Sequence, residues 1–410
     1  MPTRQYPRAA LITLTALNLF NYIDRYVLFA VQPLIQHEFH VNDIAIGFLT
    51  TAFFWCYMGV APFVGVLGDR YPRKWIIVGG ALVWSAATLL TAVTFDFRTL
   101  LIRHVIVGIG EASFGIVAPG FISDLYSEER RGRVMSILYL AQPVGSALGY
   151  MIGGQLGQLY GWRAPFYVAA APGFVLALCF VFLPEPPRGN ADRLRETHER
   201  GTVRGLFHNR AFWTATLAMA LVTFALGGMS VWMPTFLHRM RGIPLGRAGV
   251  IFGGITAVTG VFGTLTGGWI GDRLLRRTPA AHYLIASFTL VLAAPAMVVA
   301  IFTGGRYMFP AMFVAAFLLF MNTGPLNAAV VTSVGAHIRA TAVAVNIFTI
   351  HLLGDSFSPQ LMGYISARSS LDKAFIAAFF AIFGAAVVLF YGRRYAPRLA
   401  IGQQSGGTAS

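Results

Sequence analysis

Long apolar runs fill nearly the whole chain, and short polar or basic turns separate them. A run of about 20 apolar residues is long enough to cross the hydrocarbon core of a bilayer as a helix. The pattern therefore predicts an all-α membrane protein. Its twelve predicted spans are residues 8–35, 43–67, 74–94, 98–125, 131–158, 163–184, 210–237, 246–271, 280–302, 306–333, 339–366 and 373–392.

One turn sequence occurs twice, once in each half of the chain. Residues 65–74 read Gly-Val-Leu-Gly-Asp-Arg-Tyr-Pro-Arg-Lys, and residues 268–277 read Gly-Trp-Ile-Gly-Asp-Arg-Leu-Leu-Arg-Arg. A duplicated helical bundle with substrate bound between its halves is typical of secondary transporters. We therefore expect two pseudo-symmetric six-helix bundles. The predicted parts are a first bundle at 1–184, a cytoplasmic linker at 185–209, a second bundle at 210–395 and a disordered tail at 396–410.

Composition and charge distribution agree with this class. Charged residues make up 11% of the chain, against about 25% in soluble globular proteins. The net charge of +15 does not indicate nucleic-acid binding, because most of the 31 Lys and Arg lie in the termini and in one alternate set of loops. Such an excess marks the cytoplasmic side. We therefore place both termini in the cytoplasm, and the short loops and the preference for Arg over Lys favour a bacterial inner (plasma) membrane.

The repeated turns predict a gate at the cytoplasmic ends of the helices. In each copy an Asp ends an even-numbered helix, and the glycines allow two helices to approach closely. A charged cluster there can latch one conformation and break on opening; the alternative is that the basic turns only fix topology. The residues assigned to this gate are Gly65, Gly68, Asp69, Arg70, Arg73, Lys74, Asp124, Arg130, Arg131, Gly268, Gly271, Asp272 and Arg273.

Three carboxylates fall well inside predicted helices: Asp24, Glu111 and Asp355. A charge at the bilayer centre costs at least about 3 kcal/mol, so such residues are candidates for function. All three lie roughly 16 to 20 Å from the outer helix ends, near the midplane. Burial disfavours a charged carboxylate and a nearby Arg favours it, so such a site can exchange a proton during transport. We predict that Asp24 and Glu111 couple protons; the alternative is a permanent ion pair with Arg25 or Arg103.

Further polar residues predict a charged cavity. Arg25 is about 100° around the helix from Asp24, so the two cannot share a face; Arg25 either anchors an anion or pairs with Asp355. His351 and Asp355 share one face at i,i+4, where they either touch substrate or Arg25, or satisfy each other beside a helix break at Gly354. The residues assigned to substrate binding or cavity charge are Arg25, Arg103, His104, His351, Asp355 and Asn322.

Glycine recurs every fourth residue in the fifth predicted helix, at Gly145, Gly149, Gly153 and Gly157. This spacing places the glycines on one face and predicts a smooth ridge against which another helix packs closely.

The turn at 65–74 resembles the signature between helices two and three of the major facilitator superfamily. Five further stretches resemble its Spinster-like branch: 21–25 (Asn-Tyr-Ile-Asp-Arg), 107–113 (Val-Gly-Ile-Gly-Glu-Ala-Ser), 143–150 (Pro-Val-Gly-Ser-Ala-Leu-Gly-Tyr), 185–189 (Glu-Pro-Pro-Arg-Gly), and 351–355 (His-Leu-Leu-Gly-Asp) with Ser358 and Pro359. The resemblance implies a proton-linked carrier of lysophospholipids or sphingoid lipids, with acids at Asp24 and Glu111. The chain departs from the branch at His104, where members usually carry Arg.

We therefore predict a proton-coupled secondary active transporter that works by alternating access, is no enzyme and needs no cofactor or metal. Its expected partners are a small amphipathic substrate, protons and the lipid bilayer, without nucleic acid, and the protein is expected to be monomeric. The alternative is a proton-driven exporter of drugs or small organic anions. An intramembrane hydrolase is a remote alternative, since Gly354-Asp355 weakly resembles an aspartyl protease motif but a second catalytic Asp is missing and the repeat is left unexplained.

Overall fold

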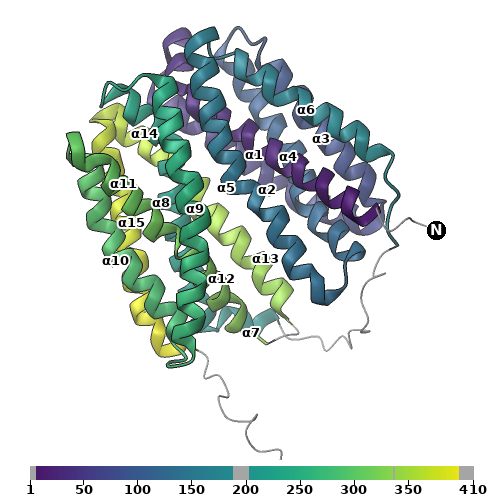
Figure 1. Ribbon diagram of the computed structural model, residues 1–410, viewed down its shortest axis with the longest axis vertical. Helices are drawn as coiled ribbons and strands as arrows, with labels where there is room; N and C mark the ends of the chain where they lie inside the picture. The colour runs from purple at the N-terminus through teal and green to yellow at the C-terminus, as the bar shows by residue number, and fades with distance from the viewer. Residues whose placement is uncertain (1–5, 188–202, 336–337, 397–410) are drawn as a thin grey trace, which may run out of the picture.

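The computed structural model describes residues 6–187, 203–335 and 338–396, and the regular secondary structure of this part of the chain is all helical. The N-terminal half contains six helices that run back and forth (Figure 1). They are α1 (Tyr6–Phe39), α2 (Asp43–Arg70), α3 (Arg73–Thr91), α4 (Phe97–Leu125), α5 (Glu128–Tyr160) and α6 (Ala164–Val181).

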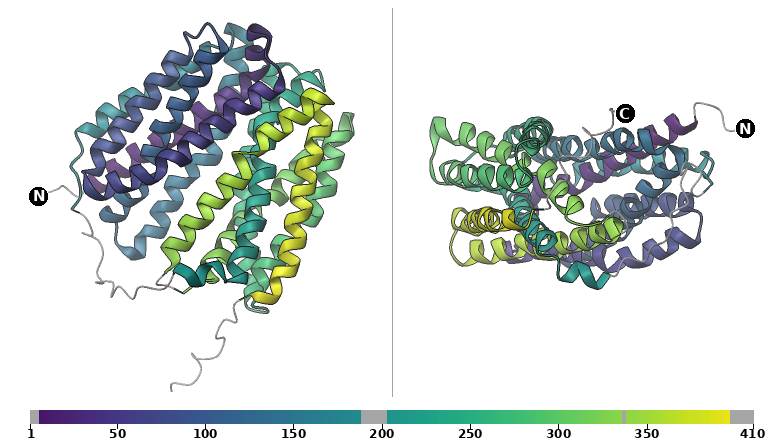
Figure 2. Two further views of the ribbon diagram at one scale, coloured as in Figure 1. Left: turned by 180° about the vertical axis from the view of Figure 1, so that it is seen from behind. Right: turned by 90° about the horizontal axis from the view of Figure 1, so that it is seen from below.

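The C-terminal half lies beside the first as a second bundle (Figure 2). A short helix, α7 (Val203–Phe207), precedes it. Its elements are α8 (Arg210–Arg239), α9 (Leu245–Leu275), α10 (Ala281–Phe302), the 3-10 turn η1 (Gly305–Tyr307), α11 (Met308–Phe320), α12 (Thr323–Thr332), α13 (Arg339–Ile350), the π-helical turn η3 (His351–Asp355), α14 (Ser358–Arg368), α15 (Leu371–Gly392) and the 3-10 turn η4 (Arg393–Tyr395).

Each predicted span coincides with helical residues, but two of them are interrupted. The span predicted at 306–333 is divided between α11 and α12, and the one at 339–366 is divided into α13, η3 and α14. Among the described residues, ten helical segments are long and apolar enough to cross a membrane. The all-helical membrane class is confirmed, while the count of twelve spans stays a prediction. The predicted disordered tail and most of the predicted linker lie outside the described residues.

Close packing at glycines holds α5 between two neighbours. A Cβ added at Gly149 would lie 2.7 Å from the carbonyl oxygen of Ile23 on α1. On another face of α5, a Cβ at Gly154 would lie 2.9 Å from the carbonyl oxygen of Leu245 and 3.3 Å from the Cα of Gly249 on α9. The predicted ridge is confirmed, since Cβ atoms at its other members would also meet α1: Gly145, Gly153 and Gly157.

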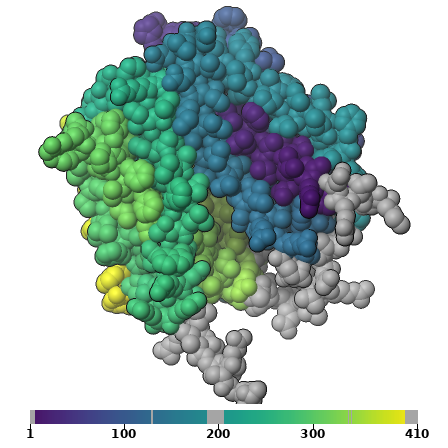
Figure 3. All heavy atoms as spheres, viewed as in Figure 1, coloured from purple at the N-terminus to yellow at the C-terminus, as the bar shows by residue number. Residues whose placement is uncertain are grey.

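We call the end of the bundle that carries Tyr6, α7 and Tyr395 the terminal end, and the other the opposite end. The named contacts between the halves lie in the middle and towards the opposite end: α5 with α9, α1 with α8, and α2 with η3 and α14. In the space-filling view the halves meet in the upper part, and lower down light-green atoms of the C-terminal half are set back between them (Figure 3). The described halves are therefore joined at the opposite end and not at the terminal end.

Candidate functional site

An ion pair between Arg25 on α1 and Glu111 on α4 lies inside the N-terminal half. Nη2 of Arg25 donates to Oε2 of Glu111, and Nε of Arg25 donates to the same oxygen at 3.2 Å. The Glu111 side chain is fully shielded from solvent, and that of Arg25 is 14% exposed. A buried charge that loses its partner is strongly destabilising, so each group requires either the other or a replacement.

Aromatic rings surround the Arg25 guanidinium. Its Cζ lies 4.9 Å from the ring centre of Phe53, 5.5 Å from Phe54 and 5.4 Å from Tyr22. These distances suit cation–π attraction, which strengthens when the cation is removed from water. The free side of Arg25 faces a cavity of about 80 Å³. The cavity is lined by Asn18, Asn21, Tyr22, Arg25, Phe54, Tyr57, Glu111, Gly115 and His351.

Asp24 points away from this cavity. It is 5% exposed, and Oγ1 of Thr88 on α3 donates a hydrogen bond to its Oδ2. Asp24 does not line the cavity, whereas its neighbour Arg25 does. The prediction that the two residues occupy different faces of α1 is confirmed. The proton-coupling candidates Asp24 and Glu111 therefore sit in separate environments, one against α3 and one against Arg25.

The two basic residues predicted on α4 lie in different places. The His104 ring is buried and stacks on Phe53 with ring centres 5.0 Å apart. Because Phe53 also contacts Arg25, the Phe53 ring separates His104 from the Arg25 guanidinium, and His104 does not line the cavity. Arg103 instead donates to the carbonyl oxygen of Leu90 and, at 2.7 Å, to Oγ1 of Thr94. The prediction of Arg103 as a cavity charge is therefore wrong in this structure, because these acceptors hold it at the end of α3.

His351 brings the C-terminal half into the site. Its ring stacks on Phe54 of α2 at 5.9 Å and lines the cavity, while its Nδ1 pairs with Oδ1 of Asp355 at 2.9 Å. The structure confirms the alternative in which the two residues satisfy each other. His351 also faces the cavity, and its contact with substrate or Arg25 stays a prediction. The π-helical turn that carries them, beside Gly354, is the predicted break, and such turns are frequent at functional sites.

Asn322 does not belong to this cavity. It is fully buried between α11 and α12, and its Nδ2 donates to the carbonyl oxygen of Leu318 at 2.9 Å. The helix interruption there leaves backbone carbonyls without an ordinary partner, and the amide satisfies one of them.

The predicted gate residues of the N-terminal half make contacts within that half. Arg73 forms an ion pair with Asp124, which joins α3 to α4. The backbone N–H groups of Arg73 and Lys74 donate to Glu185 at 2.8 Å, and Arg131 donates to a carbonyl at the end of α4 at 2.9 Å. The other charged gate residues of this half are exposed: Asp69, Arg70 and Arg130.

The second copy of the turn behaves similarly. Asp272 and Arg273 are exposed, and Arg273 lies over the ring of Trp269 at 5.5 Å. The predicted close helix approach holds at three gate glycines. A Cβ added at Gly68 would lie 3.2 Å from the side chain of Val117, and one added at Gly271 would lie 3.3 Å from that of His282. A Cβ added at Gly324 would lie 3.3 Å from the Cα of Gly268. The prediction is wrong at Gly65, where a Cβ would meet nothing within 4 Å. A latch between the halves stays a prediction.

The sequence reasoning missed a charged cluster that does join the halves, at the opposite end. Asp43 at the start of α2 is 5% exposed and pairs with Arg239 of α8 at 2.6 Å. Gln36 of α1 donates to Asp43 at 2.7 Å, and Ser366 of α14 donates to its other oxygen. We call these four residues the Asp43 cluster. Their positions near helix ends give no signal of this contact, and only the fold reveals that four helices converge on one carboxylate.

The chain matches the sequence profile of the Major Facilitator Superfamily over residues 14–359. It is 36% identical over 391 residues to protein spinster homolog 1 of Homo sapiens, covering 88% of this chain and 74% of the relative. It is 34% identical over 368 residues to the sphingosine-1-phosphate transporter SPNS2 of Xenopus tropicalis, covering 85% and 72%.

The fold is similar to a solved structure described as a bacterial homolog of the human lysosomal transporter Spinster in an inward-facing and unoccupied conformation. The TM-score is 0.89 at 24% identity, with 96% of this chain and 98% of that chain covered. A structure of the nucleoside transporter NupG has a TM-score of 0.71 at 13% identity, with 94% and 98% covered.

The Arg25–Glu111 pair generates a prediction about stability. Arg25→Met alone, or Glu111→Leu alone, leaves one buried charge without its partner and should destabilise the protein by about 3 kcal/mol. The double variant removes both charges and should recover most of that loss. The measurement is thermal unfolding of the four proteins in one detergent. A double variant as unstable as the sum of the two single variants would contradict the pairing.

Proposed function

The chain belongs to the Major Facilitator Superfamily, in its Spinster-like branch, and on this basis we propose a proton-coupled carrier that works by alternating access. It is a membrane transporter and not an enzyme. In the proposed topology twelve helices span the membrane as two pseudo-symmetric six-helix bundles. The terminal end then faces the cytoplasm of a bacterial cell, the opposite end faces the exterior, and the carrier acts as a monomer in the inner membrane.

The single observation that carries the proposal is the pairing of Arg25 with Glu111 at the wall of the cavity. In the unloaded state the negative charge of Glu111 satisfies the guanidinium. Transfer of a proton to Oε2 of Glu111 removes that charge and leaves Arg25 in need of another anion. A substrate with an anionic headgroup supplies it, because guanidinium binds phosphate and carboxylate through two parallel hydrogen bonds. Proton and substrate are thus linked through one side chain.

Asp24 acts as the second proton-handling group in this proposal. Its carboxylate is buried against α3 and accepts a hydrogen bond from Thr88. It belongs to the same helix turn as Arg25, so a change in its charge alters the field at the guanidinium without direct contact. Two acids on either side of one arginine allow protonation and substrate binding to occur at different stages of the cycle.

The proposed substrate is an amphipathic lipid-like anion of the lysophospholipid or sphingoid type. A relative named as a sphingosine-1-phosphate transporter supports this class. The cavity presents one guanidinium for a headgroup, and the rings of Tyr22, Phe54 and Tyr57 are the nearest contacts for an apolar chain. A volume of about 80 Å³ holds only a headgroup, so chain entry requires the halves to separate further. The alternative remains an exporter of drugs or small organic anions.

Alternating access has a physical basis in the asymmetry between the two ends. The Asp43 cluster and the glycine contacts between α5 and α9 close the opposite end. At the terminal end the named charge pairs stay within one half. We propose that the repeated turns pair across the halves when the terminal end closes, and that the Asp43 cluster must break for that to happen.

Proton coupling is tested by Asp24→Asn. The substitution keeps the size of the side chain and should leave the fold intact, but it should abolish substrate-driven proton movement in proteoliposomes that contain a pH-sensitive dye. Asp96→Asn is the matched control: Asp96 is an exposed carboxylate that caps α4 through the N–H of Thr99, and Asn caps equally well. Proton flux that stays normal in a well-expressed Asp24→Asn protein would refute this role.

The Asp43 cluster yields a prediction about conformation. Arg239→Gln removes the cation that joins the halves, so the opposite end should open more often. The measurement is the distance between spin labels at Phe95→Cys and Met240→Cys, with Cys56 and Cys179 replaced by Ser. The expected result is a larger long-distance population.

The matched control for this measurement is Arg163→Gln. Arg163 pairs with Glu38 at 2.6 Å at the same end, but both residues belong to the N-terminal half. This variant should leave the distance distribution unchanged. Equal distributions in the wild type and both variants would show that the Asp43 cluster does not control the opposite end.

A further inference from the structure

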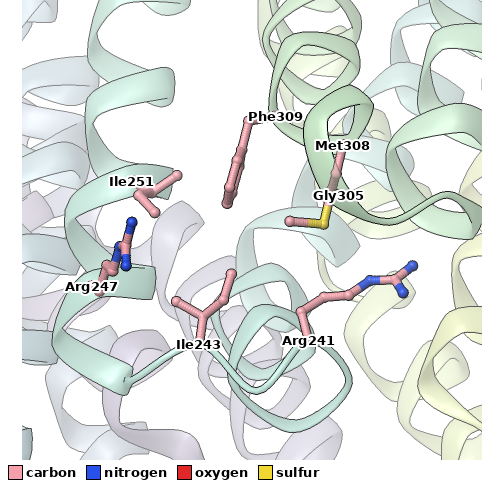
Figure 4. Close-up of a pocket in the computed structure, with 7 residues that line it drawn as sticks. All are labelled: Arg241, Ile243, Arg247, Ile251, Gly305, Met308 and Phe309. Atoms are coloured by element: carbon pink, nitrogen blue, oxygen red, sulfur yellow. The ribbon is translucent and has the colours of Figure 1, made fainter.

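A second cavity, of about 280 Å³, lies at the opposite end of the C-terminal half, separate from the Arg25 site. It lies between the turn after α8, the start of α9 and the start of α11 (Figure 4). Arg247 lies on one side of the cavity and the aliphatic part of the Arg241 side chain lies on the other. The apolar lining consists of Ile243, Ile251, Met308 and Phe309. The transport mechanism proposed above makes no use of this cavity.

The two arginines have different roles. Arg241 is engaged: it donates to the carbonyl oxygen of Ile301 at the end of α10 and lies over the ring of Phe236 at 5.1 Å, so its charge is directed away from the cavity. Arg247 is exposed and has no hydrogen bond or ion pair within the described residues. Arg247 is therefore the cation that is free to bind a ligand.

The surrounding charge favours an anion. Apart from Arg239, which is paired with Asp43, the basic residues at this end of the C-terminal half outnumber the acidic Asp372. They are Arg241, Arg247, Arg306, Arg368 and Lys373. In the proposed topology this is the non-cytoplasmic side, where basic residues are usually few. The topology thus leaves this charge unexplained. The field it produces attracts anions to the mouth of the cavity.

An apolar surface continues from the cavity towards the middle of the membrane. Phe313 lies one turn from Phe309 on the same face of α11, where it stacks on Phe317 at 6.4 Å. Phe313 and Val250 of α9 are exposed. A ligand that suits all of this surface has an anionic headgroup beside Arg247 and an acyl chain along α11.

We propose that this cavity binds one anionic phospholipid from the leaflet at the opposite end of the protein. The volume accommodates a headgroup and the first part of the chains, since pockets for whole small molecules are about 300–1,000 Å³. The rest of each chain remains in the bilayer against Phe313 and Val250. The site is independent of the proposed substrate and of proton coupling, and its test involves no transport measurement.

The test is native mass spectrometry of the purified full-length protein with phosphatidylglycerol or phosphatidylcholine added in equal amounts. We expect the first phosphatidylglycerol to bind more tightly than phosphatidylcholine. Arg247→Gln should weaken that first binding step about tenfold, the usual effect of losing one hydrogen bond between charged groups. Ile251→Trp fills the apolar part without changing the charge and should weaken it as well.

The matched control is Arg98→Gln, which removes an exposed arginine from the same end of the N-terminal half. It should leave the first binding step unchanged. Equal loss in Arg247→Gln and Arg98→Gln, or equal binding of both lipids by the wild type, would overturn the proposal. Displacement of the first lipid by inorganic phosphate at millimolar concentration would overturn it too, because the cavity would then select a free anion.

Discussion

The ion pair between Arg25 and Glu111 is the interaction on which the rest of the site depends. A guanidinium this deep in a membrane bundle is stable only while an anion accompanies it. The fold provides Glu111 for the empty carrier and surrounds Arg25 with Phe53, Phe54 and Tyr22. If a proton neutralises Glu111, the same requirement favours a substrate anion. The cost of burying the Arg25 guanidinium without an anion thereby links the proton and the substrate.

In the proposed cycle, packing between the halves converts that local exchange into a larger motion. Backbones approach closely where α5 carries Gly154 and α9 carries Gly249, and the Asp43 cluster adds a charged contact at the same end. His351 contacts Phe54 across the halves in the middle. The cavity therefore lies at the junction of both halves, so a change in charge around Arg25 acts on the contacts between them.

The sequence predicted the helices, the repeat and the buried polar residues, because a bilayer permits few kinds of structure. Long apolar stretches indicate spanning helices, regularly spaced glycines indicate close helix contacts, and the rare charges inside helices indicate buried polar sites. The separation of Asp24 from Arg25 also followed from helix geometry alone. The partner of each buried charge did not follow from the sequence. Whether Arg25 pairs with Glu111 or Asp355 depends on how α1, α4 and η3 are placed, which one sequence does not state. Arg103 was misplaced because its acceptors, Leu90 at the end of α3 and Thr94 just after it, are brought to Arg103 by the way α3 packs against α4. The pairing of Asp43 with Arg239 was missed because it too depends on how helices from both halves are placed.

The central claim is that substrate binding at Arg25 requires protonation of Glu111. Infrared difference spectroscopy of the purified carrier tests it most directly, with a lysophospholipid such as lysophosphatidylglycerol as the probe. On ligand binding we predict a new carbonyl band from a protonated carboxyl group, with uptake of a proton from a weakly buffered solution. Both signals should vanish in Glu111→Gln although the ligand still binds. Ligand binding by the wild type with no such band and no proton uptake would contradict the claim.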